Sequence, residues 1–153
     1  MTKTSRDRTI TTNRRARYDY EVLDTLEAGL VLTGTEIKSI RAGRVNLSDA
    51  HARPANGEMW LYNAHIAEYS GGNLNNHEPK RARKMLLRRD QITDLTKQVS
   101  ERGLTLVPLK LYIRGGYAKI ELAVARGKKR FDKRRAIIDR EREREARQAI
   151  GAR

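Results

Sequence analysis

Short strand-like segments separated by turn sequences fill the middle of this chain, and they limit the possible fold more than any other feature. Polar and apolar residues alternate over residues 18–22, and β-branched and aromatic residues dominate residues 104–112 and 117–125. These patterns predict half-buried β-strands. Gly115 and Gly116 predict the turn of a hairpin between the last two strands.

Further strands are predicted earlier in the chain. Residues 45–52 and 59–66 predict a pair of strands, and residues 54–57 have the turn chemistry to join them. Residues 28–29 predict another turn, which leads into a short strand at residues 30–32. At least six strands from about 110 residues favour a small antiparallel barrel, for which the oligonucleotide-binding architecture is a natural candidate.

Two short helices are predicted from capping sequences. Thr33 and Glu36 have the spacing of a capping box, so a helix is expected to begin there and to end at Gly43. Asp90 can cap a second helix that runs to about Glu101. The predicted fold is mainly β: a closed antiparallel barrel of oligonucleotide-binding type, with two or three short flanking helices and a basic C-terminal tail.

Positive charge is concentrated at the two ends of the chain. Residues 1–17 carry 6 basic and 1 acidic side chains, residues 18–125 carry 15 and 13, and residues 126–153 carry 12 and 5, so the net charges are +5, +2 and +7. Fields of this sign attract polyanions, and neutralising phosphates releases counterions. Because the tail sequence lacks the apolar face of a membrane-surface helix, we expect nucleic acid and no membrane as the partner.

The domain organisation is expected to follow the charge. Residues 1–12 have little to bury and are predicted to be disordered. Residues 13–125 are the predicted RNA-binding barrel, and residues 126–153 are a basic tail. Residues 137–150 suit a helix but have too few apolar side chains to pack on a core. We expect the tail to be disordered when free and helical when bound to RNA.

Candidate catalytic or metal-binding groups are sparse in the sequence. There is no cysteine, which excludes disulfides and cysteine-ligated zinc. His51, His65 and His77 match no metal-ligand spacing, and no phosphate-binding loop or catalytic triad is recognisable. No apolar run approaches the roughly 18 residues of a membrane-spanning helix. We expect no enzyme activity, no cofactor and a cytoplasmic protein.

One enzymatic alternative rests on Asp24, Glu36 and Lys38. An acid followed by Glu-x-Lys resembles metal-dependent nucleases, in which two carboxylates hold Mg²⁺ and the lysine stabilises developing charge. In those enzymes the Glu and Lys share one face of a strand. The capping box instead puts Glu36 and Lys38 on a helix, where positions two apart diverge. The favoured roles are therefore a cap for Glu36 and a phosphate contact or solvated charge for Lys38.

Several sequence blocks, taken together and in order, resemble the SsrA-binding protein family (small protein B). Each block is short, but the set spans residues 10–145. The blocks are NRRARYDY at 13–20, EAGL at 27–30, GTEIKSIRAG at 34–43, NLSD at 46–49, RARKMLL at 81–87, TLVPL at 105–109 and GKKRFDKR at 127–134.

This resemblance implies both a fold and a function. The fold would be a closed β-barrel of oligonucleotide-binding type with helices alongside. The partner would be transfer-messenger RNA, bound by its tRNA-like half and delivered to stalled ribosomes. The tail would enter the decoding centre and the mRNA channel of the small subunit. Elongation factor Tu and alanyl-tRNA synthetase would be indirect partners through the RNA. The family is bacterial and cytoplasmic and has no cofactor, and we expect a monomer.

The resemblance also assigns roles to individual positions. Asn13, Glu27 and Leu86 match the family's RNA-binding surface, although core packing remains an alternative for Leu86. With neighbouring cations, the predicted RNA-binding residues are Asn13, Arg14, Arg17, Glu27, Lys38, Arg41, Lys80, Arg81, Arg83, Lys84 and Leu86. The predicted decoding-centre residues of the tail are Gly127, Lys128, Lys129, Phe131, Asp132, Lys133 and Arg134. Phe131 stands where the family usually has Tyr or His, so it can stack on a base but cannot hydrogen-bond.

The main rival hypothesis is a generic ribosomal or single-strand-binding protein of the same fold. Single-strand binders need several exposed aromatic side chains on the barrel face. The chain has one Trp, one Phe and six Tyr, and most of the tyrosines fall at strand positions predicted to be partly buried. This distribution favours recognition of RNA shape over binding of any single strand.

Overall fold

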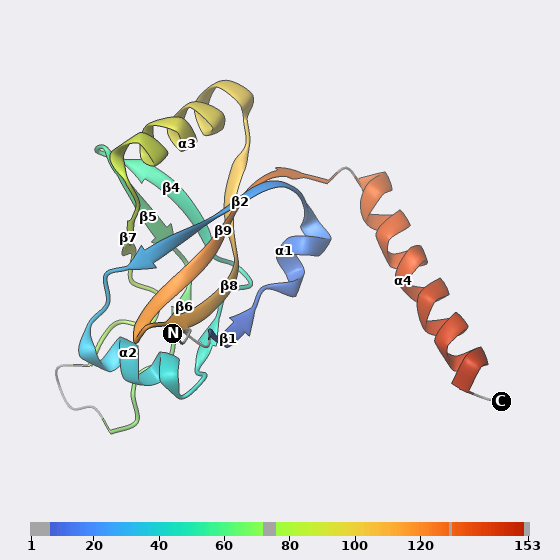
Figure 1. The fold of residues 1–153 in the computed structure, drawn as a ribbon, viewed down its shortest axis with the longest axis horizontal. Helices are drawn as coiled ribbons and strands as arrows, with labels where there is room; N and C mark the ends of the chain where they lie inside the picture. Colours follow the sequence, from blue (N-terminus) through green and yellow to red (C-terminus); the bar gives the residue numbers. More distant parts are fainter. Residues whose placement is uncertain (1–6, 72–75, 129, 152–153) are drawn as a thin grey trace, which may run out of the picture.

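The computed structural model describes residues 7–71, 76–128 and 130–151 (Figure 1). Its elements are β1 (Arg8–Thr12), α1 (Arg14–Asp19), β2 (Tyr20–Leu30), α2 (Gly34–Arg41), β3 (Val45–Asn46), β4 (His51–Ala55), β5 (Glu58–Tyr62), β6 (His65–Ile66), β7 (Arg83–Leu86), α3 (Arg89–Arg102), β8 (Thr105–Arg114), β9 (Tyr117–Gly127) and α4 (Arg130–Gly151).

The main sheet closes into an irregular ring of antiparallel strands. Its order is β8-β4-β5-β7-β2-β9, and β9 pairs back with β8. The β4–β8 contact is the register pair Ala52–Leu106, and β1 pairs with the remaining length of the same edge of β8. The β2–β9 and β8–β9 pairings each contain a register shift. The predicted mainly β, antiparallel fold is confirmed, but a regular closed barrel is wrong for this ring.

Apolar side chains from both halves of the chain fill the ring. Met59, Leu61, Met85, Ile120 and Leu122 are all buried to 1% exposure or less. Figure 1 shows α3 at one end of the ring and α2 at the other. Their buried side chains complete the core, because Leu95 of α3 and Ile40 of α2 belong to the same cluster.

A second, smaller apolar cluster lies under α1. Ala16 packs there with Val107, Leu109, Ala123 and Ala125. These strand residues alternate with the residues of β8 and β9 that point into the ring. The β8–β9 hairpin is therefore buried on both faces where α1 covers it.

The structure corrects the N-terminal predictions. Disorder over residues 1–12 is wrong for Arg8–Thr12, which add as a strand to an edge of β8 that β4 leaves open. The strand predicted at residues 18–22 begins only at Tyr20, since Asn13 caps a short helix first. The turn predicted at residues 28–29 is absent from the continuous strand β2. A Cβ on Gly29 would lie 3.3 Å from the Leu86 Cβ, so this glycine permits close strand approach.

Two predicted strands are each divided in the structure. Residues 45–52 contain β3 and β4, because the Asn46 side chain accepts a hydrogen bond from the backbone of Ser48 and forms a local turn. Residues 59–66 contain β5 and β6, separated at Asn63, which has a positive φ of 61°. The turn predicted at residues 54–57 is shorter in the structure, since Pro54 and Ala55 belong to β4 and the turn lies at Asn56 and Gly57. The turn predicted at residues 115–116 is confirmed.

The helix predictions are mostly confirmed. The Thr33–Glu36 capping box is present, and α2 ends as predicted just before Gly43. Asp90 is not the cap of α3: Arg88 precedes the helix, and Asp90 pairs with it at 3.1 Å within the first turn. The tail helix begins at Arg130 and is longer than predicted. The described chain has four helices: α1, α2 and α3 are the three flanking helices of the upper prediction, and α4 is the tail.

Candidate nucleic-acid interface

Asn13 is a buried structural residue. Its side chain is 4% exposed, and its Oδ1 accepts a hydrogen bond from the Ala16 N–H at 3.2 Å. Its Nδ2 donates to the carbonyls of Leu47 and Pro108 at 3.0 and 2.9 Å. All these partners lie inside the protein, so direct RNA contact by Asn13 stays a prediction that its burial does not support. Asn13 instead fixes α1 against β8.

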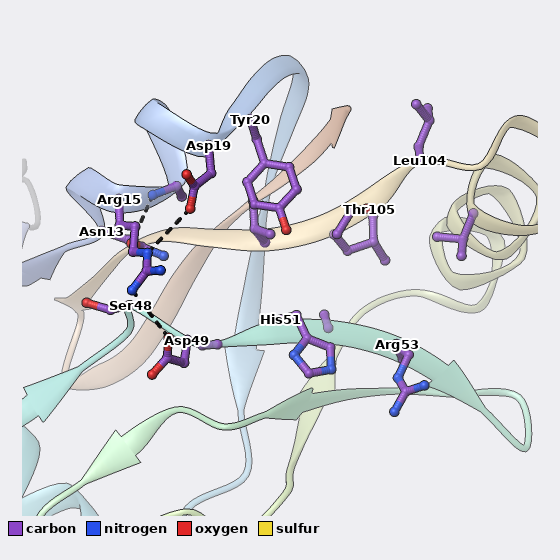
Figure 2. A pocket seen from close by; sticks show the side chains of 16 residues that line it. Asn13, Arg15, Asp19, Tyr20, Ser48, Asp49, His51, Arg53, Leu104 and Thr105 are labelled. Atoms are coloured by element: carbon purple, nitrogen blue, oxygen red, sulfur yellow. Dashed lines mark hydrogen bonds and ion pairs between the residues drawn. The ribbon is translucent and has the colours of Figure 1, made fainter. Parts of the chain in front are cut away.

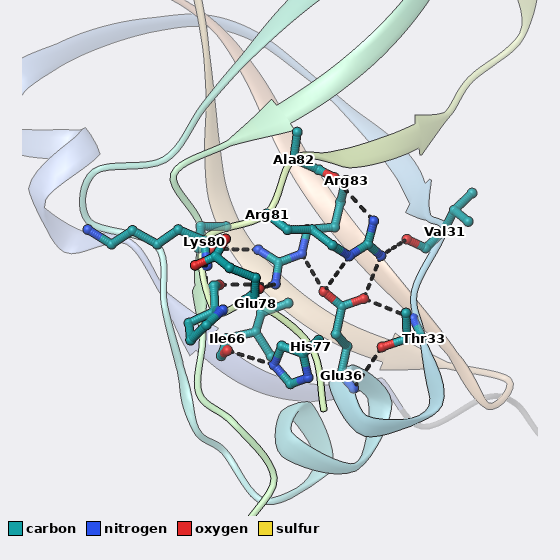
Figure 3. A network of polar contacts seen from close by, with 12 residues as sticks. Val31, Thr33, Glu36, Ile66, His77, Glu78, Lys80, Arg81, Ala82 and Arg83 are labelled. Atoms are coloured by element: carbon teal, nitrogen blue, oxygen red, sulfur yellow. Dashed lines mark hydrogen bonds and ion pairs between the residues drawn. The ribbon is translucent and has the colours of Figure 1, made fainter. Parts of the chain in front are cut away.

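Glu36 is the centre of a buried polar network (Figure 3). Its Oε1 accepts from the Thr33 N–H at 2.8 Å and from Arg81 Nη2 at 2.6 Å, and its Oε2 accepts from Arg83 Nε at 2.6 Å. Burial raises the pKa of Glu36, but the hydrogen bonds from Arg81, Thr33 and Arg83 outweigh it, and the pKa lies below the ordinary value. We call Glu36, Arg81 and Arg83 the Glu36 network.

Arg83 belongs wholly to this network. Its side chain is 0% exposed. Its guanidinium also donates to the carbonyl oxygens of Ala64 at 2.6 Å and Pro79 at 3.0 Å. The RNA contact predicted for Arg83 therefore stays a prediction that its burial does not support. Arg81 remains partly exposed, but its guanidinium is already engaged by Glu36.

The nuclease alternative fails on the same geometry. Glu36 is buried and saturated with hydrogen-bond donors, so it has no free lone pairs to direct at a metal ion. Lys38 points elsewhere, with its ammonium 5.4 Å from the Tyr69 ring centroid. Among the described residues, no group of three or more His, Cys, Asp or Glu side chains could hold a metal. The predicted capping role of Glu36 is confirmed.

Leu86 lies on the opposite side of strand β7 from Arg83. Its side chain is 53% exposed, so the core-packing alternative is wrong. It borders a hollow of about 170 Å³ that lies between α2 and the β8–β9 hairpin. Tyr117, 72% exposed at the start of β9, is another apolar side chain there. We call the following residues the Leu86 surface: Gly29, Ile37, Arg41, Leu86, Tyr117 and Lys119.

Tyr117 is a candidate residue that sequence reasoning missed. The sequence predicts that most of the tyrosines are partly buried in strands, and Tyr117 is an exception. The available signal was its position directly after the Gly115-Gly116 turn, because side chains at a hairpin tip project beyond the sheet. Arg41 and Lys119 put positive charge beside it. An exposed aromatic ring flanked by cations suits a base and its phosphate.

Glu27 adjoins the Leu86 surface through the β2–β9 pairing. It lies two residues before Gly29 on the same outer face of β2. Its Oε1 accepts from Arg114 Nη1 at 2.6 Å and from the Tyr112 hydroxyl. Burial and the hydrogen bond to Glu27 raise the pKa of Tyr112. Glu27 is thus held in place but remains partly exposed.

The other predicted cations differ in their surroundings. Lys80 is exposed near the start of the β7 segment, and Lys84 pairs with Glu58 on the outer sheet face. Arg14 and Arg17 are exposed on α1, where Arg17 Nη2 lies 3.9 Å from Glu121 Oε1. Glu121 in turn lies opposite Glu27 in the sheet, so Arg17 and Glu27 are near the same strip of β9.

A separate groove of about 480 Å³ lies between α1, β4 and the start of β8 (Figure 2). Arg15 reaches across it and lies 3.4 Å from Asp19 and 3.8 Å from Asp49. The groove is lined by two arginines, Arg15 and Arg53, and by the two acids Asp19 and Asp49, whereas the Leu86 surface has Arg41 and Lys119 and no acid, so the groove offers less net positive charge. We do not assign it to RNA binding.

The tail begins against α1. The Lys128 N–H donates to the Asp19 carbonyl at 2.9 Å, and its Nζ donates to the Arg17 carbonyl at 3.1 Å. Gly127 pairs with Tyr20 at the end of β9. Figure 1 shows α4 extending away from the ring. Lys129 lies outside the described residues, as do the side chains of Phe131, Asp132, Lys133 and Arg134.

Comparison with known proteins assigns the family. The family model described as "SmpB protein" matches residues 10–152. The chain belongs to the SmpB protein family. The SsrA-binding protein of Thermobifida fusca is 56% identical over 143 residues, which cover 94% of this chain and 89% of the relative. The SsrA-binding protein of Carboxydothermus hydrogenoformans is 54% identical over 147 residues, which cover 96% and 99%.

A solved structure described as "tmRNA-SmpB: a journey to the center of the bacterial ribosome" is also similar. It matches with a TM-score of 0.67 and 48% identity, covering 83% of this chain and 93% of that one. The family resemblance predicted from the sequence blocks is thus confirmed. In this SmpB family member, the predicted RNA-binding residues that remain exposed are Arg14, Arg17, Glu27, Lys38, Arg41, Lys80, Lys84 and Leu86.

No described helix is long and apolar enough to cross a membrane.

Proposed function

We propose that this chain binds the tRNA-like half of transfer-messenger RNA through the Leu86 surface, and that its basic tail enters the decoding centre and mRNA channel of a stalled ribosome. Binding of transfer-messenger RNA in ribosome rescue by trans-translation is the function of the SmpB family, whose members are non-enzymatic RNA-binding proteins. In this chain, the Leu86 surface would bind the RNA and the basic tail would bind the ribosome.

The exposure of Leu86 and Tyr117 carries the first part. Both are large apolar side chains that stand in solvent beside Arg41 and Lys119. Folded RNA offers sugars and unstacked bases at its loops, and these bind apolar and aromatic side chains, while cations bind the neighbouring phosphates. Glu27 can accept hydrogen bonds from base N–H groups or ribose hydroxyls. Such bonds give a specificity that contacts to phosphates cannot give. The ring then acts as an oligonucleotide-binding type of scaffold.

The composition and length of the tail support the second part. Residues 126–153 carry 12 basic and 5 acidic side chains. Helix α4 has 22 residues, so it spans roughly 33 Å at about 1.5 Å each. A basic helix of this length can leave the ring and follow an RNA-lined channel. Disorder of the tail in the free protein stays a prediction. Contacts with phosphates would offset the entropic cost of ordering the tail on the ribosome.

Further partners follow from the same proposal. Elongation factor Tu and alanyl-tRNA synthetase act on the tRNA-like half, so contact with them would be indirect, through the RNA. One copy of the chain suffices for both surfaces, which is consistent with a monomer. The similar proteins reported above come from bacteria, and ribosome rescue would place this chain in the bacterial cytoplasm.

The first test is a binding competition across a salt series. Purified protein is titrated with transfer-messenger RNA in the presence of excess bulk tRNA and single-stranded RNA. We expect a selective component that persists at high salt, because shape recognition does not depend on counterion release alone. Equal binding of every RNA, with affinity lost as salt rises, would favour the generic RNA-binding alternative.

The second test separates the two surfaces. Deleting residues 126–153 should leave binding of transfer-messenger RNA largely intact and abolish tagging of stalled chains. Phe131→Ala should weaken ribosome engagement without unfolding the ring, since stacking on a base is lost. Loss of RNA binding on tail deletion would contradict this division of labour.

A further inference from the structure

A row of cationic and aromatic side chains crosses three neighbouring strands on the outside of the ring. Arg53 of β4 lies opposite Trp60 of β5, and Trp60 lies opposite Lys84 of β7. The residues next to them along each strand point inward and are buried: Ala52, Met59, Leu61, Arg83 and Met85. Because adjacent strands are about 4.8 Å apart, the backbones at Arg53 and Lys84 are about 10 Å apart, with Trp60 between them.

A second aromatic side chain extends this row. Tyr62 follows Trp60 by two residues on β5, so both rings lie on the outer face. The rings of Tyr62 and His51 stack with centroids 5.7 Å apart and planes inclined by 24°. The Arg53 guanidinium lies 5.3 Å from the Tyr62 ring centroid. Figure 2 shows Arg53 and His51 side by side on β4.

These rings are not needed to fill the interior. Trp60 and Tyr62 are half-buried, and neither belongs to the two apolar clusters of the described residues. The row therefore holds two aromatic rings and two cations on the outside of the ring of strands. The packing of the core does not explain why these residue types are there.

The chemistry of the row matches unpaired RNA. Every base has a face that can stack on an aromatic ring, and flanking cations neutralise the phosphates on either side. Bases inside a duplex are stacked on one another and cannot reach a flat sheet face. We propose that Arg53, Trp60, Tyr62 and Lys84 bind an unpaired segment of the same RNA whose structured half the Leu86 surface holds.

Continuity with the Leu86 surface selects this RNA as the source. Lys84 and Leu86 are two residues apart on β7 and share its outer face. A strand of RNA that leaves the Leu86 surface can pass directly onto the row. This step rests on the proposed function, because it assumes that the Leu86 surface holds transfer-messenger RNA.

The acid that pairs with Lys84 does not block the site. Glu58 pairs with Lys84, and their side chains are 39% and 44% exposed. Ion pairs in this much solvent are weak and are screened by salt. An RNA phosphate can therefore replace the carboxylate as the partner of Lys84. Glu58→Gln should leave single-strand binding unchanged or strengthen it.

The chain has one tryptophan, so its fluorescence reports on this row alone. The full-length protein is titrated with a short oligoadenylate, with a duplex of the same length, with the isolated tRNA-like half and with whole transfer-messenger RNA. We expect the oligoadenylate and the whole RNA to quench the emission of Trp60. The duplex and the isolated tRNA-like half should leave it unchanged.

Matched variants test the contribution of charge. Arg53→Gln should weaken oligoadenylate binding about fivefold, and Trp60→Leu should weaken it about tenfold. Arg102→Gln removes the same charge from an exposed arginine at the end of α3 and should have little effect. Circular dichroism checks that each variant is folded, and Trp60→Phe, which keeps an aromatic ring, should retain most of the affinity.

The outcomes separate this inference from the proposed function. If transfer-messenger RNA binds selectively and the emission of Trp60 does not change, the row is not an RNA site, although the proposed function stands. Quenching by the duplex would overturn the assignment to unpaired RNA, and quenching by the isolated tRNA-like half would overturn the assignment to a segment outside that half. Quenching by the oligoadenylate but not by transfer-messenger RNA would overturn the assigned source. If no RNA binds selectively, the proposed function itself fails.

Discussion

Arg83 and Leu86 lie three residues apart on β7, and their surroundings are the reverse of what their side chains suggest. The arginine is fully buried, and the leucine is 53% exposed. Strand alternation separates them, since Arg83 and Met85 face the interior while Lys84 and Leu86 face solvent. A run of basic residues that looks uniform in sequence therefore divides into an internal part and an external part.

The two sides of β7 have different functions. On the inside, the Glu36 network joins α2 to the segment that precedes β7, and a buried charge without its partner is very costly. On the outside, an exposed leucine adds little to folding and is available to a ligand. On this strand the buried charge of Arg83 stabilises the fold, while the exposed Lys84 and Leu86 are the side chains left for the proposed RNA contact.

The largest expected effect is on folding, from Arg83→Met. This change leaves Glu36 buried without one of its two arginines, and breaking such a pair costs about 3–5 kcal/mol. The free energy of unfolding in urea measures it. Glu36→Gln together with Arg83→Met should recover part of the loss, because the one charge left without its partner, Arg81, has a side chain that is 35% exposed and can be solvated. If the single variant is as stable as the parent protein, the network is not a determinant of the fold.

The next effect concerns the other buried residue that was predicted to contact RNA. Asn13→Ala removes the cap of α1 and leaves the carbonyls of Leu47 and Pro108 without their donor. We expect a loss of about 2 kcal/mol in stability. Asn13→Asp keeps the capping oxygen but places a buried carboxylate oxygen against the two carbonyl oxygens, so it should be at least as destabilising as Asn13→Ala. Unchanged stability with lost RNA binding would restore the direct-contact hypothesis.

The roles of Arg83 and Asn13 could not be predicted from the sequence. The strands were predictable because alternation and turn residues are local signals, and the capping box of Thr33 and Glu36 is local as well. The partner of Arg83 is Glu36, 47 residues earlier in the chain, and no local pattern reveals such a contact. Asn13 is similar, because its partner Pro108 is 95 residues away.

The same limit applies to Gly29 and Leu86. A glycine in a strand pattern indicates either a turn or a close approach, and only the position of Leu86 across the sheet decides between them. The family resemblance pointed to Leu86 correctly as a surface candidate, although its apolar character alone favoured the core. The residues of the candidate site were thus partly predictable, but their division into inward and outward sets was not.

A smaller effect is expected from pH. The pKa of Glu36 is lowered in the folded protein, so its contribution to stability is present above its unfolded pKa, near 4.5, and is lost as pH falls through the folded value. The parent protein should therefore lose stability on acidification with a contribution that Glu36→Gln lacks. Thermal unfolding from neutral to acidic pH, run on both proteins, measures this difference. Parallel curves would show that the folded pKa is not lowered.

The smallest effect on folding should come from Leu86→Ala. More than half of this side chain is already in solvent, so its truncation should change the free energy of unfolding by less than about 0.5 kcal/mol. Affinity for transfer-messenger RNA should nevertheless fall about tenfold, since an apolar contact in the centre of the interface is lost.

Leu23→Ala is the matched control, because Leu23 is a 40% exposed leucine on β2 outside the Leu86 surface. If both variants bind the RNA equally well, the outside of β7 does not have the role assigned to it. If Leu86→Ala is strongly destabilising, the contrast between the two sides of β7 is wrong.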